Sequence, residues 1–512
     1  MEDILKLIEL RRKKGHRSIQ LLNQNFRKSE ISKDNLLYDS ILEFELKSDE
    51  EAASKIFNTD PNNRNYRNAK SKLKEKLLNN LYFLDYDKKG YTHYEKYEYE
   101  SMNELHHARI LMNEGATEMA TKKLLHLLKF SKICELVDIV VQVLVWLKSI
   151  YARQGKLSLY DEVELALGYY TSFQQAIRES ENLYYNELVL IKKSFSAQTR
   201  ALEKVPSSLK KITQLSIKFN SSRIELLASR LELLYLRITN NFADLENLCT
   251  ELEEGFFERK DGEIRVDLSR TSLYLTKIDA YFNLKQFEKG LDFADSKAEY
   301  FQSGTKLWFL FYEKRFLLSM HGKKFDLAAK YIRIARTDNA FKELNKEDLD
   351  RWNIYRSFLV YFNDEKLVRW GFNLNHFLSY RLNYDKDKAG YSIAVLSARF
   401  IYFLRDGELK KLNKTIKAIN KFNSSHLDKR SNYRNSVFIR LLNLVPENEY
   451  NYADVKSRCE NYIDKLINTQ IPQDNYSDLE VYPYELLWKE IMNILKLDKQ
   501  YVHFKFYHFS EA

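Results

Sequence analysis

The chain has very little glycine and proline: 13 glycines and 5 prolines in 512 residues, where average usage would supply roughly 60. A β-sandwich or an α/β enzyme needs a turn about every ten residues, and those turns are built mostly from these two residue types. The motifs GxxxxGK, GxGxxG and GxSxG are absent from the sequence, which argues against the usual phosphate-binding loops and nucleophile elbows. The composition therefore predicts an all-α protein.

Cysteine is also scarce. Cys134, Cys249 and Cys459 lie far apart, and none belongs to a CxxC pair. An odd number of cysteines without close spacing argues against a disulfide framework or a zinc site, and it is typical of a reducing compartment.

Targeting and membrane segments are not predicted either. The N-terminal segment has its basic cluster after its apolar residues, unlike a signal peptide. The longest apolar run, residues 136–147, contains Asp138 and Gln142 and is too short to span a bilayer. We expect a cytoplasmic protein without a membrane span.

A sequence pattern recurs at steps near forty residues. An aromatic or aliphatic residue is followed four positions later by a turn residue, then two positions on by an apolar residue, and three beyond that by a packing residue. A double step between residues 155 and 240 predicts one further copy near residue 198. We expect each unit to be a helix–turn–helix pair that stacks on its neighbours to bury its apolar stripe. The turn positions are Gly115, Gly155, Asn240, Lys285, Lys323, Glu365 and Gly407.

This order resembles the tetratricopeptide (TPR) family, in which a Tyr lies four residues before a Gly, an aromatic residue two after it and an Ala three further on. YARQGKL, YFNLKQF and KFDLAAKYIRIA each match part of that order, over roughly residues 100–420. The resemblance implies a right-handed superhelical array of helix–turn–helix repeats, a TPR-like α-solenoid that acts as a scaffold. Because the steps exceed the family's usual ~34 residues and its closing Pro is absent, an irregular α-bundle remains the alternative.

The two ends differ from this array. Three helices are predicted near the N-terminus, at 3–28, 34–57 and 65–84, with a turn-rich break at 58–65. Near the C-terminus, three of the five prolines follow residue 445, and the last residues, YVHFKFYHF, alternate like a strand.

The sequence thus predicts three parts. They are a basic N-terminal domain (1–100), the repeat array (101–444) and a C-terminal cap (445–512).

Catalytic and metal-binding patterns are not found. Glu104 and His107 form an ExxH pair, but a di-iron bundle needs two such pairs on facing helices, and there is no second one. We interpret both residues as ordinary helix-face residues. The sequence predicts neither enzyme activity nor a cofactor.

Positive charge is concentrated near the N-terminus. Residues 10–29 carry a net charge of +7 and residues 61–80 of +5, so the rest of the chain has a net charge of −2. A local basic patch is typical of a contact with nucleic acid or another polyanion. The candidate nucleic-acid-binding residues are Arg11, Arg12, Lys13, Lys14, Arg17, Arg64, Arg67, Lys70 and Lys74.

The second basic segment, residues 61–80, is typical of a helix that packs by an apolar stripe with basic residues on both sides of it. The following residues 81–99 predict a hairpin that turns at 87–90. Helices, then a basic helix, then a hairpin is the order of elements in a winged helix. The alternative is that the acidic segment 95–118, with a net charge of −4, neutralises the basic helix within the molecule. The predicted apolar stripe of the helix comprises Tyr66, Ala69, Leu73, Leu77, Leu81 and Leu84.

Two functional hypotheses follow from these patterns. The first is a non-enzymatic helical-repeat scaffold that binds a protein or peptide partner on its concave surface. The alternative is a nucleic-acid-binding regulator, with the basic N-terminal module as the binding part and the array as a sensor. A cryptic enzyme would require titratable groups that converge in a pocket.

Overall fold

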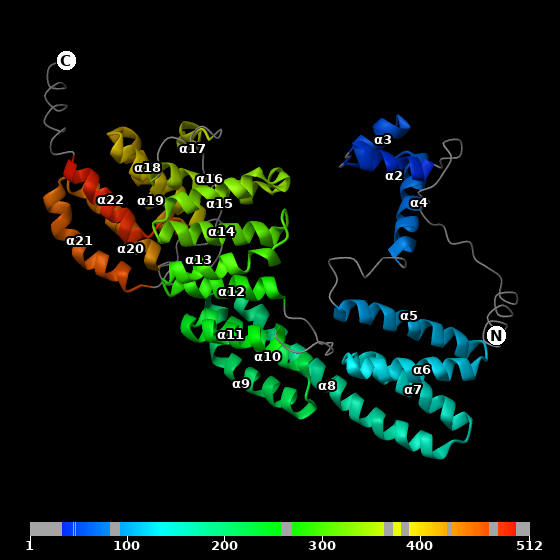
Figure 1. Cartoon of the computed structure of the whole chain (residues 1–512). Helices are drawn as coiled ribbons and strands as arrows, with labels where there is room; N and C mark the ends of the chain where they lie inside the picture. The colour runs from blue at the N-terminus through cyan, green and yellow to red at the C-terminus, as the bar shows by residue number, and fades with distance from the viewer. Residues whose placement is uncertain are drawn as a thin grey trace, which may run out of the picture. The chain divides into compact units, whose positions relative to one another are not determined.

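The computed structural model describes residues 33–44, 46, 48–81, 93–193, 195–257, 269–362, 372–379, 389–426, 433–469 and 480–497. These residues form 21 α-helices, two short 3-10 helices and no β-strand (Figure 1). The all-α prediction is therefore confirmed for the described part of the chain. The predicted helix at 3–28 and the predicted strand at the C-terminal end lie outside it.

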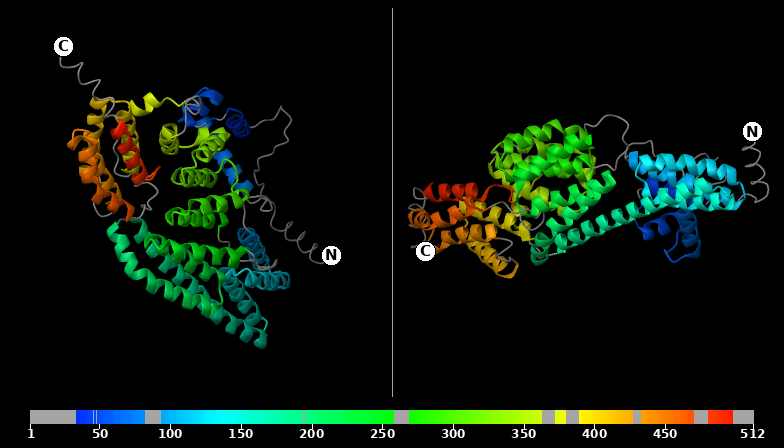
Figure 2. Two further views of the ribbon diagram at one scale, coloured as in Figure 1. Left: turned by 60° about the vertical axis from the view of Figure 1, so that its left-hand side comes forward. Right: turned by 90° about the horizontal axis from the view of Figure 1, so that it is seen from below.

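Two compact units make up the chain: one reaches to Ala176 and the other begins at Ile177. The boundary falls inside α8 (Leu157–Lys193), which the right-hand view of Figure 2 shows as one continuous helix. The predicted division of the chain at residues 100 and 444 stays a prediction. The other helices of the first unit are α2 (Lys33–Phe44), α3 (Asp49–Phe57), α4 (Arg64–Asn80), α5 (His93–Asn113), α6 (Thr117–Ile133) and α7 (Val137–Arg153).

In the second unit, helices that follow one another along the chain pack together, and Figure 1 shows α9 to α16 stacked in chain order. Its helices after α8 are α9 (Phe195–Phe219), α10 (Ser222–Ile238), α11 (Phe242–Phe257), α12 (Arg270–Asn283), α13 (Phe287–Ser296), α14 (Lys306–His321), α15 (Phe325–Thr337), α16 (Lys346–Phe362), α17 (Leu374–Ser379), α18 (Ala389–Arg405), α19 (Leu409–His426), α20 (Tyr433–Glu447), α21 (Tyr452–Ile467) and α22 (Tyr484–Leu497), with 3-10 turns at Ala298–Tyr300 and Asn339–Glu343.

Helices α2, α3 and α4 share a small core. The predicted single helix at 34–57 is wrong, because α2 ends at Phe44 and α3 begins at Asp49. Ser48 accounts for the break: its side chain accepts a hydrogen bond from the N–H of Glu51 at 3.1 Å and so caps the start of α3. The buried residues of this core are Leu37, Ala52, Ala53, Tyr66, Ala69 and Leu73.

Helices α5 to α8 share a second core, and α7 contributes most of its buried residues. The apolar run at 136–147 belongs to this buried helix, where apolar residues on several sides contact α5, α6 and α8. Among the described residues, none of the helices combines the length and the apolar character that a membrane span needs.

The predicted turn positions adopt one unusual backbone conformation. Six of the seven have a positive φ, between 56° and 77°, and the seventh, Glu365, lies outside the described residues. After Gly155, the N–H of Lys156 donates to the carbonyl oxygen of Tyr151 at 3.0 Å. This is the Schellman motif, which satisfies carbonyl groups that the end of a helix leaves unpaired. The residue four positions before each turn is therefore the one whose carbonyl group is capped.

The packing position five residues after the turn is buried in five of the six described copies, whereas Tyr160 is only half-buried. Ala120, Leu245, Gly290, Ala328 and Leu412 are buried there. Gly290 allows the closest approach, since a Cβ atom at this position would lie 3.0 Å from Cβ of Tyr281 and 3.1 Å from Cδ2 of Leu318.

The predicted repeat copy near residue 198 stays a prediction, because the junction between α8 and α9, residue 194, lies outside the described residues. Among the described residues, Asn220 has a left-handed turn, with a φ of 47°. Glu135, with a φ of 51°, is a further turn of the same kind between Gly115 and Gly155. The sequence pattern did not include Glu135 among its turn positions.

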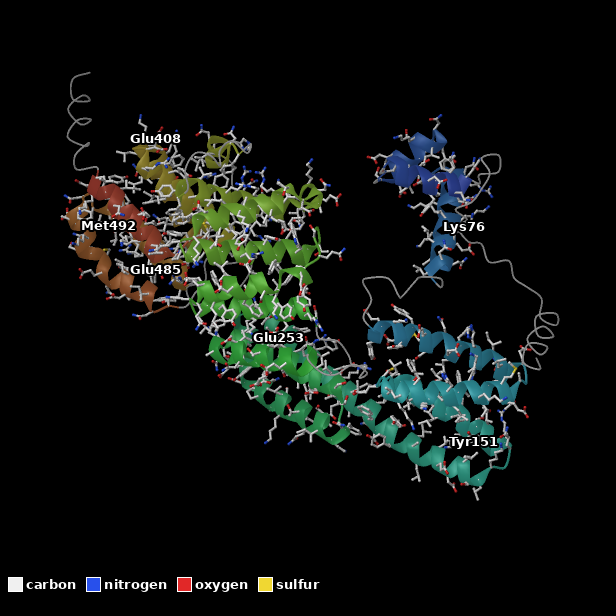
Figure 3. The ribbon with its side chains drawn as sticks, viewed as in Figure 1. Lys76, Tyr151, Glu253, Glu408, Glu485 and Met492 are labelled. Carbon is white, nitrogen blue, oxygen red and sulfur yellow. The ribbon has the colours of Figure 1, made fainter. Side chains whose placement is uncertain are left out.

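Ion pairs connect alternate helices of the second unit. Arg237 of α10 lies 3.6 Å from Asp279 of α12, and Asp279 also binds Lys314 of α14. The residue before Lys314 in α14, Glu313, binds Arg351 of α16 at 2.9 Å. Figure 3 shows the side chains of these stacked helices. Because these pairs are largely buried, removing one partner would leave an uncompensated charge.

Replacing Lys323 by Gly should stabilise the second unit by about 1 kcal/mol, because glycine adopts a positive φ without the steric cost that lysine has there. Lys330→Gly, at an exposed position inside α15, should instead destabilise it by about 1 kcal/mol. Denaturant unfolding of the two variants measures this difference. Equal destabilisation by both variants would contradict the role assigned to the turn.

Candidate functional site

The three cysteine thiols are poor candidates for nucleophiles. Cys134, Cys249 and Cys459 are all buried. Burial raises the pKa of Cys134 to about 11 and that of Cys249 to about 12, and it also raises the pKa of Cys459. All three thiols therefore stay protonated near neutral pH and act as small core residues.

The ExxH pair is part of a surface ion-pair network. Nδ1 of His107 lies 3.5 Å from Glu104, and the same carboxylate binds Lys123 of α6. Lys123 lowers the pKa of Glu104 against the opposing effect of burial. Within the described ranges, no three His, Cys, Asp or Glu residues are placed to hold a metal ion.

The second basic segment forms α4, which packs against α2 and α3. Tyr66, Ala69 and Leu73 are buried as the apolar stripe predicts, whereas Leu77 and Leu81 are exposed. Leu84 lies outside the described residues. The helix therefore docks by its N-terminal half.

Two of the basic residues on α4 form ion pairs with acidic residues of the neighbouring helices. Nζ of Lys70 lies 2.6 Å from the carboxylate of Asp49, which also accepts a hydrogen bond from the hydroxyl group of Tyr66 at 2.5 Å. The bond from Lys70 lowers the pKa of Asp49, and burial together with Asp49 raises the pKa of Tyr66 to about 12. Lys76, labelled in Figure 3, pairs with Asp34 of α2 at 2.6 Å.

Four other bases of α4 remain on its exposed side. Arg64, Arg67, Lys72 and Lys74 are exposed, and none of them has an ion-pair partner among the described residues. Arg11, Arg12, Lys13, Lys14 and Arg17 lie outside the described residues. The structure thus brings together part of the predicted basic patch and pairs Lys70 with Asp49 at the surface.

The predicted hairpin at 81–99 is wrong in its second half. Residues from His93 onward belong to α5, and 82–92 lie outside the described residues. Tyr94, Tyr97, Leu105 and Met112 pack on the core of α5 to α8, a spacing that follows the helical period rather than the alternation of a strand. The winged-helix interpretation therefore loses one of its two strands.

A different surface feature lies on the N-terminal half of α8. Leu165 is 79% exposed and Tyr169 is 50% exposed, one helical turn apart. The helical period places Asp161 and Glu162 on either side of this pair, and both are exposed. We call these four residues the α8 strip. The sequence pattern did not single it out, because apolar residues at helical spacing usually indicate a core face.

The strongest buried charge cluster involves Arg434 of α20, which is 1% exposed. Its guanidinium group donates to both carboxylate oxygens of Glu480 at 2.7 Å and to Glu485 at 2.5 Å. The two carboxylates outweigh the effect of burial and raise the pKa of Arg434. Glu485, labelled in Figure 3, belongs to α22.

Residues 480–484, here called the C-terminal clasp, connect this cluster to distant helices. Nε2–H of His321 in α14 donates to the carbonyl oxygen of Glu480 at 2.9 Å. Tyr482 packs on Phe362 of α16, with ring centroids 4.2 Å apart, and Tyr484 stacks on Phe438 of α20 at 4.0 Å.

The clasp is a structural cluster rather than an active site. His321 and Glu480 are buried, and both carboxylate oxygens of Glu480 already bind Arg434. No substrate can reach them without unfolding the segment. Sequence reasoning missed this cluster, since His321 and Glu480 are 159 positions apart.

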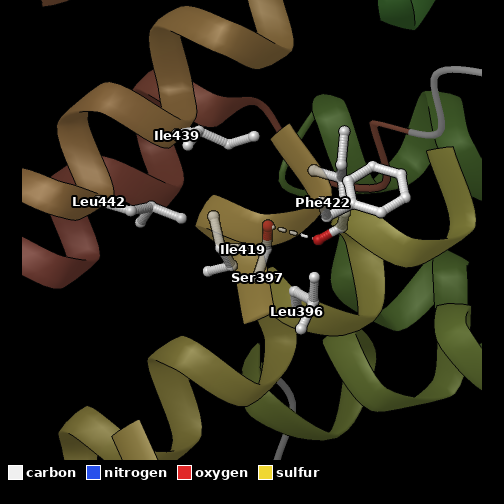
Figure 4. A pocket seen from close by; sticks show the side chains of 7 residues that line it. Leu396, Ser397, Ile419, Phe422, Ile439 and Leu442 are labelled. Carbon is white, nitrogen blue, oxygen red and sulfur yellow. Dashed lines mark hydrogen bonds between the residues drawn. The ribbon is translucent and has the colours of Figure 1, made fainter. Parts of the chain in front are cut away.

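A small apolar pocket lies between α18, α19 and α20 (Figure 4). It is lined by aliphatic side chains, by Phe422 and by Ser397, whose hydroxyl group donates to the carbonyl oxygen of Ile393 at 2.7 Å. The gap has no room for a water molecule, so it is a packing gap in the core rather than a ligand site.

No protein-family model, curated protein or solved structure matches this chain significantly. The two surfaces described above, the exposed bases of α4 and the α8 strip, are therefore interpreted from their own chemistry.

Stability should depend on pH through His321. Burial lowers its pKa to about 4 in the folded protein, from an ordinary value of 6.5. Between these values the unfolded chain binds more protons, so stability is retained above pH 6.5 and falls by up to about 3 kcal/mol as the pH decreases towards 4. In His321→Gln, the amide group can still donate to Glu480, and this part of the pH dependence should disappear.

Denaturant unfolding of the wild type and His321→Gln between pH 4 and pH 7 measures the effect. His376→Gln, a change at an exposed position of the same unit, provides the control and should leave the pH dependence unchanged. A wild type and a His321→Gln variant with the same pH dependence would exclude His321 as its source.

Proposed function

We propose that the chain is a helical-repeat scaffold, a TPR-like α-solenoid with a right-handed superhelical array, that binds a protein or peptide partner. The recurrence of one turn geometry at Gly115, Gly155, Asn240, Lys285, Lys323 and Gly407 supports the repeat architecture. Sequential helix packing and the ion pairs between α10, α12, α14 and α16 support it as well, because each repeat of a solenoid contacts chiefly its neighbours.

The α8 strip is the observation that carries the binding proposal. Leu165 and Tyr169 expose large apolar groups on a rigid helix, and tyrosine is one of the residue types that dominate binding energy at protein interfaces. A folded helix also presents both side chains without a further loss of backbone conformational entropy on binding.

The charges beside the strip indicate the chemistry of the partner. Asp161 and Glu162 flank the apolar pair, while the nearby Glu164 is bound to Lys148 of α7. We therefore propose a partner segment that places an apolar side chain between lysine or arginine residues. The acidic flanks would speed its association and exclude acidic partners.

Leu165→Glu combined with Tyr169→Glu should weaken partner binding at least about tenfold, because both substitutions remove apolar contact area and add negative charge at its centre. The measurement is affinity purification from native cells with nuclease treatment, followed by titration of the purified partner. Val189→Glu combined with Ile217→Glu provides the control, since it changes the charge equally at two other exposed apolar positions.

We expect a partner protein to co-purify with the wild type and with the control variant after nuclease treatment, and to be absent from the purification with the α8 variant. Co-purification of nucleic acid without any protein, or equal capture by the α8 variant and the wild type, would overturn the proposal. Circular dichroism of both variants verifies that they are folded.

A further inference from the structure

We propose that the exposed face of α4 binds double-stranded DNA through the major groove. This inference goes beyond the scaffold function and is independent of the α8 strip. It rests on the bases of α4 that the molecule leaves available, on the polar residues between them and on how the helix is held.

The charges of the α2–α4 module are separated in space. Residues 33–81 contain nine bases and nine acids, so the module has no net charge. Six of those bases, but only one acid, Glu75, lie on α4. Because Asp34 and Asp49 neutralise Lys76 and Lys70 on the side that packs against α2 and α3, the unneutralised bases lie on the side facing solvent. A polyanion would therefore approach the exposed face of α4 rather than the acidic helices.

The exposed face also carries side chains that can form hydrogen bonds with DNA bases. Asn65, Asn68 and Ser71 lie between the four exposed Arg and Lys residues along the helix, and all three are exposed. Arginine binds guanine and asparagine binds adenine through paired hydrogen bonds in the major groove. The face thus combines side chains for phosphate contact with side chains for base contact.

The dimensions of the helix suit the groove. An α-helix with its side chains is about 10–12 Å in diameter, and the major groove of B-DNA, ~12 Å wide, admits it. Arg64 to Lys74 extend about 15 Å along the helix axis, so side chains from several turns can reach the groove. Glu75 shares this face but lies towards its C-terminal end. The N-terminal half of α4 would therefore enter the groove, as in helix–turn–helix proteins, where that half of the recognition helix contacts the bases.

Other nucleic acids fit this face less well. Single-strand binding relies on exposed aromatic side chains on which bases stack, and the one aromatic residue of α4, Tyr66, is buried with its hydroxyl group bound to Asp49. Double-stranded RNA has a major groove too deep and narrow for a helix. The observations therefore favour duplex DNA.

The packing of α4 provides the rigidity that groove binding requires. Tyr66, Ala69 and Leu73 anchor the helix in the core of α2 to α4, and the Lys70–Asp49 and Lys76–Asp34 pairs hold its two sides. The bases that would contact phosphate are consequently not needed for folding, and they can be substituted without disturbing the core.

The test is the affinity of the full chain for a fluorescent 30-base-pair duplex of random sequence, measured by anisotropy at 50 and 200 mM salt. Reversing Arg64, Arg67 and Lys74 to Glu should weaken binding roughly a hundredfold or more at the lower salt. For the variant with Gln at these three positions, we plot the logarithm of the affinity against the logarithm of the salt concentration. The slope should become less steep by roughly 0.9 for each phosphate contact that is lost.

A matched control is available on α19, where Lys410, Lys414 and Lys417 form another exposed basic row. Their reversal to Glu changes the net charge by the same amount and should leave DNA binding unchanged. Single-stranded DNA and double-stranded RNA of the same length should bind at least about tenfold more weakly than the duplex. The Leu165→Glu, Tyr169→Glu variant should bind the duplex like the wild type, which separates this test from that of the scaffold function.

Three outcomes would overturn the proposal: no duplex binding at 50 mM salt, equal loss with the α4 and α19 variants, or retention of binding by the α4 variants. Preference for RNA or for single strands would assign the surface to another ligand. Thermal unfolding of each variant is recorded in parallel. Should the Glu variant unfold, the Gln variant, which adds no negative charge, decides the outcome.

Discussion

The stacking of successive helices depends on the way in which many of them satisfy their last carbonyl groups before the next helix begins. A left-handed residue after the helix end directs two N–H groups back onto those carbonyl groups, and the chain reverses within three or four residues. Glycine adopts this conformation most easily, yet the chain has few glycines and often uses other residues. At Lys285, Lys323 and Glu135 the strain of a positive φ is retained, so tertiary packing of the flanking helices must stabilise these turns.

The clasp adds a long-range constraint that a stack of helices does not have. Contacts between successive helices are local in sequence and determine only how each helix lies on the previous one. The Arg434–Glu480 pair, the His321–Glu480 hydrogen bond and the rings around Tyr482 connect the region of α14 to α16 with that of α20 to α22. The buried Arg434 makes this connection specific, because only a segment with correctly placed carboxylates can neutralise it.

Sequence reasoning predicted the features that depend on local spacing. The helical class, the left-handed turns and the packing positions all follow from patterns within about ten residues. The class and the turns are confirmed where the structure describes them, and five of the six described packing positions are buried. It failed at the predicted hairpin of residues 81–99, because the partly buried Tyr94 and Tyr97 belong to α5 and follow its helical period. It also failed at Ser48, where one capping side chain divides an otherwise continuous apolar pattern into two helices.

For the candidate sites, the distribution of charge along the sequence located α4, but it did not identify which of its basic residues are free of ion pairs within the protein. That distinction depends on Asp34 and Asp49, whose positions against α4 are set by the packing of three helices rather than by spacing along the chain. In α10 to α16 of the second unit, by contrast, the pairs between alternate helices are largely buried, and we interpret them as stabilising contacts. Exposed and unpaired charge is therefore more informative about binding than total charge, since a buried pair can be removed only at a cost to folding.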